Sequence, residues 1–373
     1  MSTFVSMAYP AKLPSQKSIS SSAKKVVAWY RQNARDLPWR KTNNPYHIWI
    51  SEVILQQTTV SQGTSYYLRF LERYPTVENL AAAPLDDVLK LWEGLGYYSR
   101  ARNLHASAQV VVDQFGGVFP QTHEDILSLK GIGPYAAAAI GSFAFGLPHV
   151  VVDGNVLRLV SRLFGIKDSI DDTATKKHIK EIAQTMQDCS DPGEFNQAIM
   201  EFGAICCTYK SPQCNSCVLQ KQCAAYKDNA IASIPLRTKK IKKRNRYFHF
   251  HIVEDASGSI IVEQRLNKDV WQGLHQFLLH ESTEPDHASR IHDVLDIAVK
   301  KIVETRLHGP YKQLLTHQRI TATFYHHRLS SAHSKASTKG KKLAKWEELE
   351  ALAWPRMITK FLSSDMLSQD VTQ

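Results

Sequence analysis

The chain has 373 residues, of which 43% are hydrophobic, and this length and apolar content predict two or three domains with hydrophobic cores. No stretch approaches the roughly 18 apolar residues of a membrane-spanning helix, and residues 1–14 lack the apolar core of a signal peptide, so we expect a soluble intracellular protein. The formal net charge of +11 favours an acidic partner such as nucleic acid, although metabolic enzymes can also be basic.

The N-terminal part of the chain has helical patterns. Residues 1–23 are rich in serine and lysine and contain no acidic residue, so we expect a disordered tail, with an organelle transit peptide as the alternative. Residues 24–225 carry apolar side chains mostly at helical spacing. Capping residues predict two helix starts in this region, at Asn44 with Pro45 and at Thr122 with Asp125.

A glycine-containing turn lies at residues 129–136 (LKGIGPYA). Gly131 and Gly133 bracket one apolar residue, which lets the backbone turn sharply and approach a partner closely. Pro134 can then begin an alanine-rich helix, whose free N-terminal amides suit a phosphate. The pattern fits a hairpin that binds DNA phosphates, and it also fits a helix–turn–helix without a ligand.

Two carboxylates stand in apolar surroundings. Glu52 lies among Ile50, Val53 and Leu55, where desolvation would raise its pKa and favour a general acid. Its simpler interpretation is an ordinary solvated glutamate on a helix. Asp153 follows the apolar residues 150–152, and its simpler interpretation is a helix N-cap.

Four cysteines fall within 17 residues at the spacing C-x6-C-x2-C-x5-C. Structural zinc sites usually pair two short C-x(2–4)-C units, whereas long arms around a single C-x2-C suit an iron–sulfur cluster held by four thiolates. Zinc, disulfides and free thiols remain alternatives at this point. Cys206 and Cys189 fall outside the pattern and are expected to be buried apolar residues. The four are Cys207, Cys214, Cys217 and Cys223.

The C-terminal third changes to strand-like patterns. Residues 236–246 form a basic run without core residues, which predicts an interdomain linker near phosphates. Residues 247–280 alternate as strands do, so we expect an α+β domain. The remaining predictions are helices over 288–304 and 345–362, a strand over 318–326 and a flexible polar loop over 330–342.

The chain resembles the helix–hairpin–helix DNA glycosylases of the endonuclease III superfamily, and within it the MutY-type adenine glycosylases. The resemblance lies in the order of three features: the hairpin at 129–136, the run at 150–155 and the cysteine cluster. The likeness is strong over residues 24–225 and weak over 246–360. Four further motifs carry it: LPWR at 37–40, WISEVILQQT at 49–58, LWEGLGYY at 91–98 and FNQA at 195–198.

The resemblance implies a multidomain fold, with an all-α glycosylase core of two helical lobes and a C-terminal α+β Nudix-like domain. A six-helix lobe with the hairpin would span about 45–148, and an iron–sulfur lobe would combine the N-terminal helix with about 149–230. The expected divisions are a tail (1–23), the core (24–230), a basic linker (231–246), the Nudix-like lesion-recognition domain (247–362) and a second tail (363–373).

The resemblance also implies a cofactor and a partner. The four cysteines would hold a 4Fe–4S cluster. The partner would be double-stranded DNA containing adenine opposite 8-oxoguanine or guanine, bound by a monomer with no membrane association. The expected location is the cytoplasm and nucleoid of a bacterium, or the nucleus or mitochondrion of a eukaryote.

The resemblance gives chemical roles to four residues. Glu52 would protonate the departing adenine, and Asp153, positioned by Asn155, would stabilise the positive charge at the sugar. This agrees with the need of glycosidic cleavage for two carboxyl groups in different environments. Bifunctional relatives carry a lysine at the position of Tyr135, and tyrosine cannot form an imine, so we expect a monofunctional enzyme.

Further residues match family positions that contact DNA. Trp39, Arg40, Leu55 and Gln197 would line the adenine pocket. Gln57 and Thr58 with Tyr97 would lie beside the opposing base, although Trp39 and Tyr97 could instead be core aromatics. Gly131 and Gly133 would contact the DNA backbone.

The C-terminal domain departs from the family pattern. Arg265 and residues 271–274 resemble its early strand and turn, but no Nudix catalytic box occurs in residues 246–310, so recognition is expected rather than nucleotide hydrolysis. The lesion-reading loop, typically Phe-Ser-His, is represented by Leu315, Thr316 and His317. Thr316 and His317 would read the lesion without the leading aromatic ring. The alternative functions are an endonuclease III-like pyrimidine glycosylase/lyase and a catalytically silent iron–sulfur DNA-damage binder.

Overall fold

The computed structural model describes residues 15–187, 191–238, 242–284, 291–294, 301–332 and 341–365. The chain divides into two compact units. Unit 1 comprises residues 1–78 and 107–239, and unit 2 comprises residues 79–106 and 240–373. In the described part of the chain, no helix is long and apolar enough to cross a membrane.

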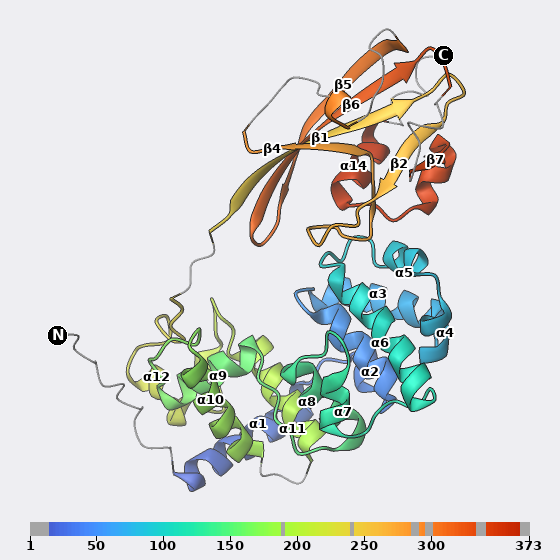
Figure 1. Ribbon diagram of the computed structural model, residues 1–373. Helices are drawn as coiled ribbons and strands as arrows, with labels where there is room; N and C mark the ends of the chain where they lie inside the picture. Colours follow the sequence, from blue (N-terminus) through green and yellow to red (C-terminus); the bar gives the residue numbers. More distant parts are fainter. Residues whose placement is uncertain are drawn as a thin grey trace, which may run out of the picture. The chain divides into compact units, whose positions relative to one another are not determined.

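Unit 1 is built from helices (Figure 1). Asn44 caps α2 by accepting hydrogen bonds from the amides of Tyr46 and His47, and Pro45 occupies the first helical turn, as the capping pattern predicted. Thr122 caps α7 in the same way through the Asp125 amide. Its helices are α1 (Gln16–Asn33), η1 (Pro38–Arg40), α2 (Pro45–Leu55), α3 (Val60–Arg73), α7 (His123–Ser128), α8 (Pro134–Phe145), α9 (Gly154–Phe164), α10 (Thr173–Gln187), α11 (Pro192–Glu201), η2 (Phe202–Cys206), η3 (Cys214–Ser216), η4 (Gln220–Gln222) and α12 (Ala224–Lys227).

The N-terminal helix corrects the predicted tail. Helix α1 begins at Gln16, and Ile19 and Ala23 are buried in the core that α1 shares with α8, α9, α10 and α11. Residues 16–23 are therefore helical, because their apolar side chains at helical spacing have a core to pack against. Residues 1–14 of the predicted tail lie outside the described residues, as does Cys189.

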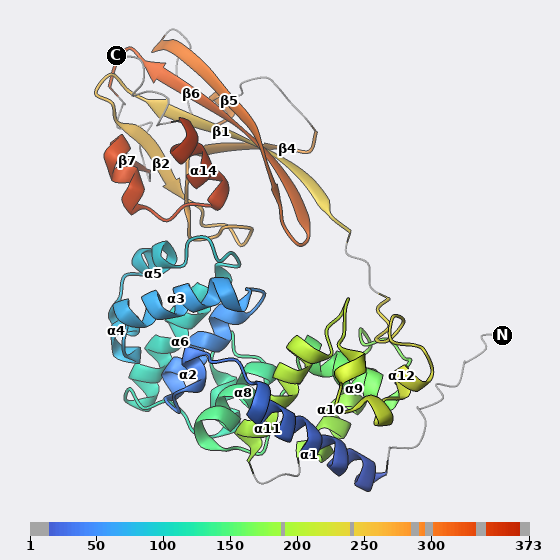
Figure 2. The ribbon, with the colours of Figure 1, turned by 180° about the vertical axis from the view of Figure 1, so that it is seen from behind.

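Unit 2 combines a mixed sheet with helices (Figure 2). The strand order in the sheet is β3-β2-β1-β6-β5. In addition, β4 pairs with β1 and β7 pairs with β2. Strands β1 and β6 run parallel to each other. Phe361 of α14 stacks on Phe324 of β6 at 4.3 Å. The elements are α5 (Leu85–Leu91), β1 (Arg244–Glu254), β2 (Ile260–Gln264), β3 (His275–Gln276), β4 (Leu278–Ser282), α13 (Ile291–Val294), β5 (Ile302–Leu314), β6 (Gln318–Leu329), β7 (Lys342–Ala344), η6 (Trp346–Ala351) and α14 (Arg356–Asp365). Helices α4 (Val77–Ala82) and α6 (Ser99–Phe115) cross the boundary between the units.

Several C-terminal predictions need correction. The predicted linker is ordered at both ends: Leu236 pairs with Ser169, and Arg244 begins β1. Residues 302–304 of the predicted helix 288–304 belong to strand β5, which the sequence pattern did not reveal because its side chains are mostly exposed. Of the predicted polar loop over 330–342, residues 333–340 lie outside the described residues, as do 239–241, 285–290, 295–300 and the tail residues 366–373.

Candidate active site

Unit 1 contains a pocket of about 350 Å³, the size of a small-molecule site. The residues that line it come from α2, from the segments around Arg40 and Asp153, from α8 and from the C-terminal end of α11. The predicted residues that it brings together are Trp39, Arg40, Glu52, Leu55, Gln57, Thr58, Tyr135, Asp153, Asn155 and Gln197.

Glu52 is buried on α2, with 6% of its surface exposed. Burial raises the pKa of its carboxyl to about 7, and the negative charge of Asp153 adds to this rise. The hydrogen bond from Tyr135 and the positive charge of Arg40 oppose the rise. The carboxyl can therefore exchange a proton near neutral pH, which an ordinary solvated helix glutamate does not do.

Asp153 is the N-cap of α9, as its position before Gly154 predicted. Its Oδ1 accepts hydrogen bonds from the amides of Asn155 and Val156 at 2.9 and 2.8 Å, and Asn155 Nδ2 donates to Oδ2 at 2.7 Å. Burial raises the pKa of Asp153, and these three hydrogen bonds and the charge of Arg158 oppose the rise. The carboxylate is thus fixed in orientation and receives donors to its charged form.

Tyr135 lies in the first turn of α8, directly after the hairpin. Its hydroxyl hydrogen-bonds Glu52, and Met200 Sδ lies 4.0 Å from the same oxygen. Burial, followed by the charges of Glu52 and Asp153, raises the pKa of Tyr135 well above its ordinary value, so the phenol is neutral. Within the protein, the carboxyl group that bonds this phenol is that of Glu52.

The sequence reasoning missed Glu201, which is buried at the end of α11. Its carboxylate accepts bonds from Arg35 at 2.6 and 2.7 Å and from Arg40 at 2.9 Å. Burial raises its pKa, but these arginine hydrogen bonds outweigh that effect and lower the pKa to about 2. Glu201 therefore anchors Arg40 in the pocket wall, and only the FNQA motif nearby pointed to this helix. Gln197 of that motif accepts a bond from Tyr30 at 2.8 Å.

Two polar residues follow α2 in the pocket wall. Helix α2 ends at Leu55, and Gln57 is exposed with a φ of 59°. Because this φ is left-handed, the backbone at Gln57 does not continue the right-handed helix α2. Thr58 Oγ1 is buried without a hydrogen-bond partner among the described residues, so it retains an unused donor at the pocket.

The hairpin glycines lie outside this pocket. Gly131 and Gly133 are exposed in the turn between α7 and α8, and Gly131 has a φ of 84°, which an L side chain disfavours. Gly133 is the N-cap of α8, so the free amides of α8 begin at an exposed position.

The four cysteines line one cavity with Cys206, which is buried as predicted. Arg162 Nη1 lies 3.6 Å from Cys207 Sγ, and Arg158 Nε donates to the Cys207 carbonyl at 2.8 Å. Across the described residues, no three His, Cys, Asp or Glu side chains converge as the ligands of a single metal ion. Four thiols around one cavity are a donor set that could hold an iron–sulfur cluster.

Arg158 also connects the loop of Asp153 and Asn155 to this cavity. Its Nη2 donates to Asn155 Oδ1 at 2.9 Å and to the Gly203 carbonyl at 2.6 Å. The same side chain therefore contacts the residue that holds Asp153 and the backbone of the first cysteine.

Unit 2 contains a second pocket, of about 460 Å³. Tyr97 is 44% exposed with a φ of 49°, and its hydroxyl hydrogen-bonds Thr316 Oγ1. His317 also lines this pocket, so the structure brings together the three predicted DNA-contacting residues of unit 2. The other lining residues include Asp269, Val270, Trp271 and residues 313–315 and 318.

Two regions of the chain match known families. Residues 50–185 match the HhH-GPD superfamily of base excision DNA repair proteins, and residues 249–364 match the NUDIX domain. The adenine DNA glycosylase of Buchnera aphidicola subsp. Baizongia pistaciae is 35% identical over 253 residues, 68% of this chain and 72% of that protein. The adenine DNA glycosylase of Rattus norvegicus is 43% identical over 217 residues, 56% of this chain and 42% of that protein.

Solved structures resemble the helical part. A thermostable thymine-DNA glycosylase is 31% identical with a TM-score of 0.53, covering 57% of this chain and 98% of that one. An endonuclease III solved in a non-covalent DNA complex is 24% identical with a TM-score of 0.50, covering 58% of this chain and 98% of that one. The second likeness concerns the fold alone.

Proposed function

We propose that this chain, which belongs to the adenine DNA glycosylase family, hydrolyses the N-glycosidic bond of adenine mispaired with 8-oxoguanine or guanine. Its membership makes it a base excision repair enzyme with the predicted helix–hairpin–helix core and Nudix-like C-terminal domain. The observation that carries the proposal is the presence of Glu52 and Asp153 in one pocket, with different partners and different electrostatic surroundings.

Glu52 is the proposed general acid. With a pKa of about 7, about half of its carboxyl groups are protonated at neutral pH. The acid can therefore donate a proton to adenine N7 as the glycosidic bond breaks, and the resulting carboxylate can then accept a proton from the attacking water. The hydrogen bond from Tyr135 supports the carboxylate that remains after proton transfer.

Asp153 is the proposed anionic partner of the sugar. Its three donors, from Asn155 and Val156, favour its charged form and fix its orientation, so it can stabilise positive charge at C1′ or form a transient covalent adduct. Tyr135 occupies the position where a lyase needs an amine. A phenol cannot form a Schiff base, so the product is an abasic site in an intact strand.

The flipped adenine would occupy the pocket of unit 1. Extrusion of a base costs a few kcal/mol, which the pocket must recover through stacking and hydrogen bonds. Trp39 provides a ring, held edge-on by Tyr67 at 5.5 Å. Arg40 and Gln197 provide polar groups that are already fixed by Glu201 and Tyr30.

The base opposite adenine would bind at the second pocket. Thr316 supplies a hydroxyl and His317 an imidazole, and the exposed ring of Tyr97 can stack against a base. The exposed turn at Gly131 and Gly133, before α8, would contact backbone phosphates.

We further propose that Cys207, Cys214, Cys217 and Cys223 hold a 4Fe–4S cluster. The cavity that they share, the sulfur-only donor set and the adjacent Arg162 support this assignment. When bound, the cluster supplies a rigid covalent anchor for residues 207–223. The chain would act as a monomer on DNA, in the cytoplasm of a bacterium or in the nucleus or mitochondrion of a eukaryote.

The test is a single-turnover assay on duplexes with adenine opposite 8-oxoguanine, guanine, cytosine or thymine. We expect fastest release of adenine opposite 8-oxoguanine, slower release opposite guanine, and strand breaks only after alkali. A strand break before alkali would contradict monofunctional chemistry. Binding of the 8-oxoguanine duplex without release of adenine would identify a silent damage binder instead.

A further inference from the structure

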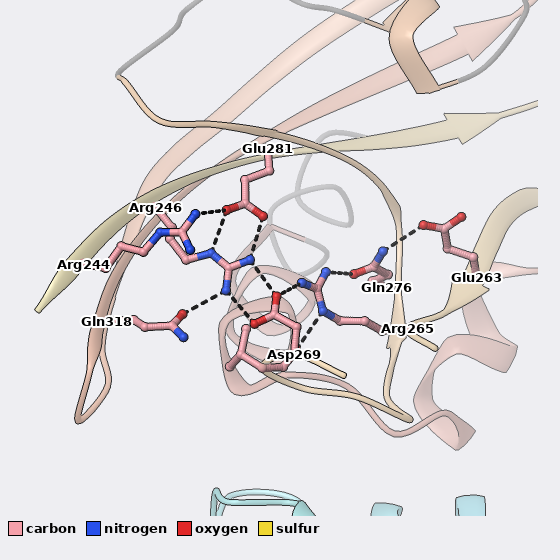
Figure 3. Close-up of polar contacts among 9 residues, drawn as sticks. Arg244, Arg246, Glu263, Arg265, Asp269, Gln276, Glu281 and Gln318 are labelled. Carbon is pink, nitrogen blue, oxygen red and sulfur yellow. Dashed lines mark hydrogen bonds and ion pairs between the residues drawn. The ribbon is translucent and has the colours of Figure 1, made fainter. Parts of the chain in front are cut away.

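Arg246 of β1 is a buried cation at the centre of a polar network in unit 2 (Figure 3). The sequence pattern placed it in a phosphate-facing linker, but only 5% of its surface is exposed. Its Nε and Nη2 donate to Glu281 of β4 at 2.7 and 2.6 Å. Nη1 and Nη2 donate to Asp269 at 2.9 and 2.6 Å, and Nη1 donates to Gln318 Oε1 at 2.9 Å.

These five bonds use every N–H donor of the guanidinium, which no lysine could reproduce. Its Cζ atom also lies over the ring of Phe248, 4.7 Å from the ring centroid. These contacts fix the guanidinium of Arg246 in one orientation, and they also fix the side chains that bond it.

Two of those partners line the second pocket from different segments of the chain. Asp269 belongs to the segment 269–271, which we call the loop wall. Gln318 ends the segment 313–318, which we call the hairpin wall. Arg246 itself does not line the second pocket, but it bonds both walls at once.

Each wall transmits this constraint to residues that face the pocket. In the loop wall, Asp269 also accepts from Arg265 at 2.5 Å, and Arg265 Nε donates to the Val270 carbonyl at 2.7 Å. In the hairpin wall, the Leu315 amide donates to the Gln318 carbonyl at 2.8 Å, which closes the turn that carries Thr316. The loop wall and the lesion-reading turn are therefore connected through one guanidinium.

We propose that Arg246 is a positioning residue that holds the two walls of the second pocket in register, and thereby sets the preference for 8-oxoguanine over guanine. The inference rests on the proposed function of that pocket. 8-Oxoguanine and guanine differ by few atoms, so discrimination between them requires polar groups fixed to within a fraction of an ångström. A bidentate clamp on both walls supplies that precision.

The experiment measures the ratio of single-turnover rates opposite 8-oxoguanine and guanine, at subsaturating enzyme, for the full-length holoenzyme. Arg246→Lys keeps the charge but has three N–H donors in place of five, so it cannot form the paired bonds to Asp269 and Glu281 together with the bond to Gln318. We expect the ratio to fall about tenfold, which corresponds to about 1.4 kcal/mol, the size of one charge-assisted hydrogen bond. The rate with saturating enzyme on the guanine duplex should stay unchanged, because the adenine pocket is untouched.

A second pair of variants guards against a folding defect. Gln318→Leu removes only the hairpin-wall acceptor and should lower the ratio, whereas Gln318→Glu keeps an acceptor and should preserve it. Glu304→Gln is the matched control, because Glu304 bonds Arg306 and Arg328 on the same hairpin but does not line the second pocket. Glu304→Gln should have the same rate ratio and the same midpoint of thermal unfolding as the wild type.

A double-mutant cycle with Thr316→Ala separates positioning from general destabilisation. If Arg246 acts through the hairpin wall, Arg246→Lys should have little further effect on the ratio once Thr316 is truncated. Additive losses would overturn the inference, as would a wild-type ratio in Arg246→Lys or in Gln318→Leu. A wild-type enzyme that releases adenine equally opposite 8-oxoguanine and cytosine would instead contradict the proposed function, and the inference with it.

Discussion

Glu52 should lower the stability of the protein in order to serve catalysis. The carboxyl is buried with a pKa of about 7, against about 4.5 for an exposed glutamate. In the unfolded chain the group ionises above about pH 4.5, whereas in the folded protein it stays protonated until about pH 7. The free energy of unfolding therefore falls as pH rises through this window and levels off above it.

The size of this loss follows from the two pKa values. At 1.36 kcal/mol for each unit, the difference corresponds to roughly 3 kcal/mol at pH 8. Glu52→Gln removes the ionisable group and nearly keeps its shape. We expect the variant to be more stable than the wild type by up to about 3 kcal/mol at pH 8, with most of that gain absent at pH 4.5, and to release no adenine.

The assay is urea unfolding of wild type and Glu52→Gln at pH 4.5, 6, 7 and 8, with adenine release measured on the same preparations. The informative quantity is the change in the difference between the two proteins with pH, because constant effects of the substitution cancel. A pH-independent difference would refute the buried-carboxyl reasoning. A variant with full activity would refute the assignment of Glu52 as the acid.

Four other outcomes are expected. Tyr135→Phe removes the hydrogen bond that lowers the pKa of Glu52, so the fall in single-turnover rate at alkaline pH should move to higher pH; an unmoved or acid-shifted limb would contradict the contact. Asp153→Asn should abolish turnover but keep DNA binding, measured by fluorescence anisotropy, and equal loss of both would indicate a structural role. Glu201→Gln should cost about 3 kcal/mol of unfolding free energy because it leaves Arg40 without its carboxylate, and an unchanged urea midpoint would argue against that anchor. DNA affinity should weaken steeply between about 50 and 200 mM salt, whereas a flat response would contradict phosphate binding by basic residues.

Local rules predicted the parts of the site that local chemistry governs. The caps at Asn44, Thr122 and Asp153 depend on a side chain and amides two or three residues away, so their sequence pattern was sufficient. The cysteine spacing likewise restricts where four thiols can lie, and the structure places them around one cavity. The alternation of residues 247–280 predicted strands, and β1 and β2 form there, although most side chains of β1 are buried on both faces.

Other features depend on residues far apart in the chain. Arg246 lies in a basic run, and nothing local shows that Glu281 and Asp269, more than 20 residues away, neutralise it. Glu201 gains its role from Arg35 and Arg40, which are more than 160 residues earlier in the sequence. A pKa or a pocket wall is a sum over groups that only the tertiary fold brings together. The sequence by itself therefore determined which chemical groups this glycosylase carries, and the tertiary structure decided which of them are buried, paired and held in place.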